Sequence, residues 1–174
     1  MNDLVTARGY GWARQAGNFA EVRIADVTTD AVTDRPMRVL VADDHPTNRA
    51  VIEVILGLIE AELVAVEDGA QAVDAFKRQH FDIVLMDLQM PVMDGLTAIR
   101  EIRRFEAEEQ RFPTPVLAVT ANTMSEHVAA SKAAGADQHI AKPVNPEQLL
   151  RTITETVARH SVMAASQQSA ARSA

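Results

Sequence analysis

Five short, mostly apolar runs alternate with five longer segments of helical periodicity between residues 38 and 160, and this alternation constrains the fold more than any other feature. In the longer segments, apolar residues recur every three or four positions, as on one face of a helix. The predicted strands are 39–42, 63–66, 83–86, 116–119 and 138–141, and the predicted helices are 46–60, 69–79, 95–109, 124–134 and 146–159. This alternation predicts an α/β fold in which five helices cover both faces of a five-stranded parallel sheet.

The helical segments also indicate which side chains face the sheet. In the first predicted helix, the apolar residues assigned to the inner side are Val51, Ile52, Ile55, Leu58 and Ile59. The inner faces of the other helices are expected to carry Ala72, Val73, Phe76, Leu96, Ile99, Ile102, Leu149, Leu150, Ile153 and Val157. Each helix would then cover the sheet with one apolar stripe.

Polar residues follow the predicted strands at the ends that meet along one edge of a parallel sheet. Asp43 and Asp44 follow the first strand, Asp87 the third, Thr120 the fourth and Lys142 the fifth. Taken singly, each has a structural interpretation, because aspartates cap helices, threonines end strands and lysines lie in solvent. Ligands of open α/β sheets bind beyond the carboxyl ends of the strands, so the five residues together predict one pocket.

The side chains of this predicted pocket favour phosphoryl chemistry assisted by magnesium. Three crowded carboxylates remain ionised together only beside a cation. Hard oxygen ligands without histidine or cysteine suit Mg²⁺. A carboxylate beside Mg²⁺ and an ammonium group can attack a phosphoryl group, whose oxygens the metal, the lysine and the hydroxyl would stabilise. One aspartate of the adjacent pair would bind the metal, and the other would orient a metal-bound water.

The segment from about Arg38 to His160 resembles the receiver domain of bacterial two-component response regulators. The resemblance rests on separate motifs in the family's order: DD, MDLQMPVMDG, VTA and KP. It implies a flavodoxin-like, doubly wound sheet of strand order 2-1-3-4-5. It also implies that Asp87 is the phosphoacceptor, that Lys142 contacts the phosphoryl group and that Thr120 moves toward it after phosphorylation.

The resemblance further implies the composition of the metal site. Mg²⁺ would be bound by Asp44, by Asp87 and by the backbone carbonyl of Gln89, while Asp43 would act through a water. His45, although adjacent, is expected to be a loop residue without a ligand role.

Three residues near the pocket are expected to be structural. The peptide bond from Lys142 to Pro143 would be cis, as it is in that family. Asp94 would cap the third helix, and Gly95 would permit a tight entry into it.

One switch position departs from the family pattern. Receivers usually carry Tyr or Phe three residues before the lysine, where this sequence has His139. A polar, titratable ring there predicts altered coupling to Thr120, and the alternative is a solvent-facing substitution without consequence. Gln89, Ala121 and Asn122 would flank the phosphoryl group, and none of them offers a base for hydrolysis.

The predicted function is that of a phosphoacceptor, not an enzyme, that takes a phosphoryl group from a histidine kinase or a histidine phosphotransfer protein. It would then relay the group or switch contacts with an unknown downstream protein. The donor is expected to dock on the first helix.

The favoured interpretation is a stand-alone receiver without a DNA-binding output. The alternative is the C-terminal receiver of a hybrid histidine kinase, because the stretch DDHPTN resembles the receivers of such kinases. An aspartate-nucleophile phosphatase is disfavoured, because it needs a second acid at the position of Gln89.

Composition argues against several other classes of protein. A formal net charge of −7 disfavours binding to nucleic acid or to anionic membranes. The absence of cysteine excludes disulfides and thiolate metal sites. Without a signal-peptide core or a run of about 18 apolar residues, the chain is expected to be cytoplasmic.

The predicted organisation has three parts. Residues 1–36 are expected to be a largely flexible N-terminal extension, and residues 37–160 the receiver domain. Residues 161–174 are expected to form a disordered tail, because SVMAASQQSAARSA is small and polar.

Overall fold

The computed structural model describes residues 35–121 and 125–172 and contains the predicted five-stranded parallel sheet. Its strands are β1 (Arg38–Ala42), β2 (Glu62–Val66), β3 (Ile83–Asp87), β4 (Val116–Thr120) and β5 (Gln138–Ala141). The strand order β2-β1-β3-β4-β5 confirms the predicted doubly wound topology. Residues 1–34, which make up almost all of the predicted N-terminal extension, lie outside the described residues.

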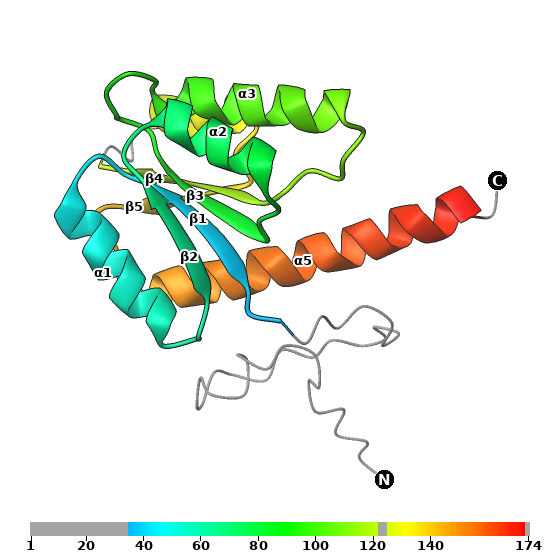
Figure 1. The fold of residues 1–174 in the computed structure, drawn as a ribbon, viewed down its shortest axis with the longest axis horizontal. Helices are drawn as coiled ribbons and strands as arrows, with labels where there is room; N and C mark the ends of the chain where they lie inside the picture. Colours follow the sequence, from blue (N-terminus) through cyan, green and yellow to red (C-terminus); the bar gives the residue numbers. More distant parts are fainter. Residues whose placement is uncertain (1–34, 122–124, 173–174) are drawn as a thin grey trace, which may run out of the picture.

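Helices cover both faces of this sheet (Figure 1). They are α1 (Pro46–Gly57), α2 (Gly69–Arg78), α3 (Gly95–Glu108), α4 (Ser125–Ala134) and α5 (Pro146–Arg172). Helices α2 and α3 lie on one face, and α1 and α5 lie on the other. No helix in the described ranges is long and apolar enough to cross a membrane.

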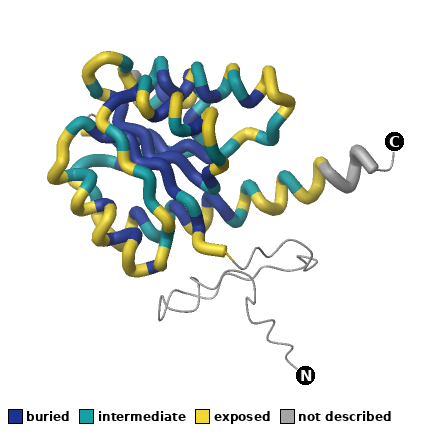
Figure 2. Tube along the Cα trace, viewed as in Figure 1, coloured by how far each residue is buried: buried dark blue, intermediate teal, exposed yellow. Residues whose placement is uncertain are grey.

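Two apolar cores separate the sheet from its helices. Because successive strand residues point to opposite faces, Val39 and Val41 of β1 pack with α1 and α5, whereas Leu40 and Ala42 pack with α2 and α3. Every residue of β3 and β4 is buried, as the dark sheet in Figure 2 shows. This burial fixes the carboxyl edge of the sheet, where the polar residues lie.

The inner face of α1 differs from the prediction at two positions. Val51 and Leu58 are 45% and 63% exposed, so their assignment to the core was wrong. They lie seven residues apart, Leu58 being the C-cap residue of α1, and both are on its outer side, so the inner stripe is narrower than predicted. The buried residues of this segment are Ile52, Ile55, Leu56 and Ile59.

The end of α5 also differs from the prediction. The helix continues to Arg172, through most of the segment predicted to be a disordered tail, and projects past the sheet (Figure 1). No proline or glycine interrupts residues 147–172, and alanine, the strongest helix former, recurs there. The hydroxyls of Ser161 and Ser166 donate to carbonyl oxygens one turn earlier.

Candidate functional site

The carboxyl edge of the sheet brings together the side chains that the sequence places at the strand ends. Asp43 follows β1, Asp87 and Thr120 are the last residues of β3 and β4, and all three are at most 4% exposed. Lys142 follows β5, and its Nζ lies 2.5 Å from Oδ2 of Asp87 and 2.8 Å from Oδ2 of Asp43. One ammonium group therefore bridges two buried carboxylates from neighbouring strands.

Asp43 is held by the first turn of α1 rather than acting as its cap. The N-cap residue of α1 is His45, whose side chain makes no capping hydrogen bond. The backbone N–H of His45 donates to Oδ1 of Asp43, and Nδ2 of Asn48 lies 3.1 Å from both carboxylate oxygens. Arg49 donates to the Asp43 carbonyl oxygen. Neither Asn48 nor Arg49 was assigned a role from the sequence, although each is one helical turn from the aspartate pair.

Asp44 is more exposed than Asp43 and pairs with an unexpected partner. Nδ1 of His45 lies 2.9 Å from Oδ1 of Asp44. This hydrogen bond, together with the charge of Asp44, raises the pKa of His45. Ligand atoms of Asp43, Asp44 and His45 all lie within 4.8 Å of one another, a group that does not include Asp87.

Burial governs the ionisation of Asp87. It raises the pKa of this carboxyl above its usual value, although hydrogen bonds from Lys142 and from the Gln89 N–H act in the opposite direction. Burial also acts to lower the pKa of Lys142, but its hydrogen bonds to Asp43 and Asp87 outweigh burial and raise it. The ammonium group of Lys142 therefore remains charged beside the two carboxylates.

The donor set fits a magnesium ion. Asp43, Asp44 and Asp87 offer carboxylate oxygens; within the described residues, Lys142 bonds to Asp43 and Asp87, and His45, which is a cation only when protonated, bonds to Asp44. Three carboxylates exceed the positive charge of Lys142 even when His45 is protonated, and a hard divalent cation would balance the excess.

The segment after Asp87 fixes the backbone of that residue. A Cβ atom on Gly95 would lie 2.0 Å from the carbonyl oxygen of Asp87, so only glycine allows α3 to begin this close. Asp94 caps α3 by accepting from the N–H and hydroxyl of Thr97. Both observations match the structural roles predicted for Asp94 and Gly95. The peptide bond between Lys142 and Pro143 is cis, as expected.

The remaining predicted positions lie on β4, on β5 and just beyond β4. Thr120 is 3% exposed, and its carbonyl oxygen accepts from the Lys142 N–H. Ala121 is exposed, and Asn122 lies outside the described residues. His139 is partly buried on β5, and its Nδ1 has no hydrogen-bond partner among the described residues.

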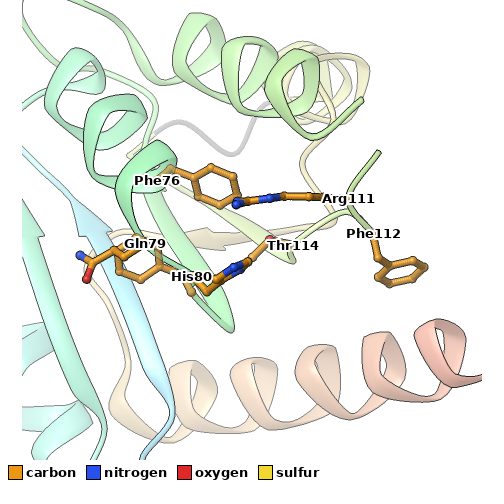
Figure 3. Close-up of a pocket in the computed structure, with 7 residues that line it drawn as sticks. Phe76, Gln79, His80, Arg111, Phe112 and Thr114 are labelled. Atoms are coloured by element: carbon orange, nitrogen blue, oxygen red, sulfur yellow. The ribbon is translucent and has the colours of Figure 1, made fainter. Parts of the chain in front are cut away.

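A cavity of about 240 Å³ lies away from these residues (Figure 3). Its lining residues precede β3 and β4, at the amino edge of the sheet, opposite Asp87. They are Phe76, Gln79, His80, Phe81, Arg111, Phe112 and Thr114. The cavity contains none of the predicted site residues.

Comparison with known proteins identifies a matching family model. Residues 39–154 match the model of the response regulator receiver domain. The sensor protein GacS of Pseudomonas syringae pv. syringae is 39% identical over 122 residues, which are 70% of this chain and 14% of that protein. The sensor histidine kinase RcsC of Escherichia coli is 35% identical over 128 residues, covering 73% of this chain and 13% of that protein. The chain therefore spans only a small part of these relatives.

Two solved structures share the fold. One is the receiver domain of a Pseudomonas aeruginosa sensor histidine kinase, which was crystallised with a magnesium ion coordinated in its active site cleft. It is 34% identical to this chain, with a TM-score of 0.65, and the match covers 71% of this chain and 99% of that chain. The Saccharomyces cerevisiae co-crystal of the phosphotransfer protein Ypd1 with the receiver domain of Ssk1 gives 28% identity and a TM-score of 0.67, covering 71% of this chain and 90% of the matched chain.

Proposed function

Because the chain belongs to the response regulator receiver domain family, we propose that Asp87 accepts a phosphoryl group from a phosphohistidine of another protein or domain. The observation that carries this proposal is the bridge from Lys142 to Asp43 and Asp87 at the carboxyl edge of the sheet. It places an ammonium group beside the one carboxylate that ends the central strand β3.

In the proposed transfer, a carboxylate oxygen of Asp87 attacks phosphorus while the phosphorus–nitrogen bond to the donor imidazole breaks. The imidazole nitrogen keeps the electron pair of that bond and takes up a proton. Lys142 stabilises charge on the phosphoryl oxygens, and the hydroxyl of Thr120 donates to one of them. The backbone N–H of Gln89, 3.0 Å from Oδ1, orients the carboxylate.

Magnesium would be held by Asp44, by Asp87 and by the backbone carbonyl of Gln89, with Asp43 acting through a water. When bound, it would neutralise charge on the transferring phosphoryl group. Asn48 and the His45 N–H orient Asp43, because each donates a hydrogen bond to its carboxylate. The magnesium-containing receiver of the Pseudomonas aeruginosa kinase supports this assignment.

The relatives favour the hybrid-kinase alternative over the stand-alone interpretation. GacS is a sensor protein and RcsC a sensor histidine kinase, and the matched segment makes up 14% and 13% of their lengths. We therefore propose that this receiver serves in a hybrid histidine kinase relay, receiving the phosphoryl group from a kinase histidine and passing it to a histidine phosphotransfer protein. The Ypd1–Ssk1 co-crystal supports a phosphotransfer protein as a class of partner.

The outer face of α1 is the proposed docking surface for this partner. Val51, Val54 and Leu58 are 45%, 71% and 63% exposed, and their spacing of three and four residues aligns them along one side of the helix. Burying this stripe against an apolar helical surface would orient a phosphohistidine toward the carboxyl edge.

The test is the intact mass of the protein after incubation with a phosphorylated histidine kinase core and Mg²⁺. We expect the wild type to gain one phosphoryl group and Asp87→Asn to gain none, and prior chelation of Mg²⁺ to abolish the gain. If the wild type remains unmodified with several kinases and with acetyl phosphate, the proposal is wrong and the domain is a constitutive binding module.

A further inference from the structure

Val92 occupies a backbone conformation that its side chain disfavours. It lies in the loop between β3 and α3, and its φ is +64°. The N–H of Met93 donates to the carbonyl oxygen of Pro91 at 2.7 Å, which closes a three-residue γ-turn around Val92. A positive φ makes this the rarer and more strained form of γ-turn, and a β-branched residue there is an outlier.

The fold imposes this turn through residues on either side of Val92. The Met93 carbonyl oxygen accepts from the N–H of Gly69 at the start of α2. The N–H of Gly95 donates to the Leu88 carbonyl oxygen, which folds the loop back onto β3. Met93 also packs against the core beneath α2 and α3. Since the backbone is fixed by these neighbours, glycine or asparagine would suit position 92 better than valine.

The side chain of Val92 is mostly exposed in the folded domain. It is 87% exposed, more than any other large apolar residue in the described part of the chain. The strain is therefore not offset by burial within the domain. Strained residues that the surrounding structure holds in place are concentrated at binding and catalytic sites.

Val92 lies within reach of any protein that docks over Asp87. It is three residues from Gly95, so the two Cα atoms are at most about 11 Å apart. Gly95 in turn lies so close to Asp87 that a Cβ atom added to it would be 2.0 Å from the Asp87 carbonyl oxygen. A typical interface covers about 800 Å² on each partner, equivalent to a disc of about 16 Å radius. A partner centred on Asp87 would cover the Val92 side chain.

We propose that Val92 is a specificity-determining contact for the phosphohistidine-bearing partner, and that it inserts into an apolar surface beside the partner's phosphorylated histidine. This inference rests on the proposed phosphotransfer and names one of its contacts. Valine is retained at the strained position because its exposed methyl groups become buried when the partner docks.

Two substitutions distinguish the effect of the apolar Val92 side chain from the effect of the backbone strain at this position. Val92→Thr keeps the branched shape, and hence the strain, but replaces a methyl group with a hydroxyl. Val92→Gly removes both the side chain and the strain. Gln110→Gly is the matched control, because exposed Gln110 also has a positive φ, of 52°. It follows the end of α3, roughly 21 Å along the helix axis from Gly95.

Several purified, phosphorylated histidine phosphotransfer proteins, Ypd1 included, are first compared as donors to the wild type, and the fastest donor is chosen. The measurement is the rate of phosphoryl transfer from this donor to each variant. Each rate is divided by the rate of phosphorylation by acetyl phosphate, which needs no docking surface. We expect the quotient to fall about tenfold in both Val92 variants, equivalent to about 1.4 kcal/mol, and to be unchanged in Gln110→Gly. Both glycine variants should raise the unfolding midpoint by about 2–4 °C, and Val92→Thr should not.

The outcomes distinguish this inference from the function on which it rests. If the ratio of the protein-donor rate to the acetyl phosphate rate were the same in the Val92 variants as in Gln110→Gly, the inference about Val92 alone would be overturned. Labelling by acetyl phosphate without transfer from any protein donor would overturn both the docking contact and the relay. Absence of labelling from every donor would overturn the phosphoacceptor function itself.

Discussion

Nε2 of His160 lies 3.1 Å from Oδ1 of Asp137, and this contact attaches α5 to the loop that precedes β5. Asp137 also accepts from Nη2 of Arg103 and from the N–H of Val116. Arg103 in turn pairs with Glu106, which is 2% exposed. A network of charged groups therefore joins α3, β4, β5 and α5 at the edge of the sheet opposite Asp87.

Asp137→Asn should make the stability of the protein less dependent on acid pH. Burial acts to raise the pKa of Asp137, but hydrogen bonds from His160 and Val116 and the charge of Arg103 outweigh it and lower the pKa. A carboxyl with a lowered folded-state pKa stabilises the fold above its unfolded pKa, near 3.9, and this stabilisation is lost as the pH falls through the folded-state pKa.

Urea denaturation of Asp137→Asn at a series of pH values tests this. We expect the variant to lose about 1–3 kcal/mol of unfolding free energy at pH 7, and we expect its difference from the wild type to shrink below about pH 4. Asp74→Asn, which alters an exposed pair with Arg78, should change stability by less than about 0.5 kcal/mol. A difference that stayed constant down to pH 2 would argue against this role of Asp137.

Gly95→Ala should destabilise the domain strongly. The added methyl group would overlap the carbonyl oxygen of Asp87, which is backbone and cannot rotate away. We expect a loss of about 3 kcal/mol or more in thermal or chemical unfolding. Gly57→Ala is the control, since no atom lies within 4 Å of the Cβ it would add at the end of α1. That variant should be neutral or slightly stabilised, and equal losses in both would contradict the steric explanation.

His139→Phe should stabilise the unphosphorylated domain and change its response to phosphorylation. The substitution removes a buried Nδ1 that has no hydrogen-bond partner among the described residues, which we expect to raise the unfolding free energy by about 1 kcal/mol. NMR chemical shifts of free and phosphorylated protein measure the response. Identical shift changes on α4 and β5 in both proteins would mean that His139 has no role in switching.

Acidic substitutions on the outer face of α1 should slow transfer from a protein donor. Val54→Glu and Leu58→Glu change exposed side chains, so the unfolding free energy should change by less than about 0.5 kcal/mol. Rates are compared with those of Val162→Glu, which places the same charge on an exposed apolar position of α5. Equal rates in all three variants would remove α1 from the docking surface.

Ala165→Pro should shorten α5 without weakening the domain. Proline at this exposed position removes a helical hydrogen bond from the part of α5 that extends past the sheet. We expect circular dichroism at 222 nm to show a loss of helix, while the urea midpoint stays unchanged and Ala165→Ser resembles the wild type. A lower midpoint would show that the extension stabilises the core.

The sequence pattern was sufficient to predict the strands and the residues that meet at the carboxyl edge, whereas the strand order was implied by the resemblance to receiver domains. Apolar runs such as 83–86 allow few alternatives, because only a buried strand accommodates them between two turns. Asp87 and Lys142 could be placed together because parallel strands bring their carboxyl ends to one edge.

Features that depend on tertiary packing were not predictable in the same way. Val51 and Leu58 are as apolar as their buried neighbours, so only the orientation of α1 on the sheet separates them. The positive φ of Val92 could not be predicted from the sequence, because valine is not a residue typical of turns with positive φ. The small, polar composition of residues 161–172 indicated disorder, although their high alanine content is equally compatible with the helix observed.

The contact between Gly95 and Asp87 determines which parts of the domain can respond to modification. A Cβ atom on Gly95 would lie 2.0 Å from the Asp87 carbonyl oxygen, so the start of α3 has no room to shift toward β3. The N–H of Gly95 also donates to the Leu88 carbonyl oxygen, which ties the start of α3 to the end of β3. If Asp87 is phosphorylated as proposed, we therefore expect the larger structural changes at Thr120 and Lys142, on the β4–β5 side of the molecule.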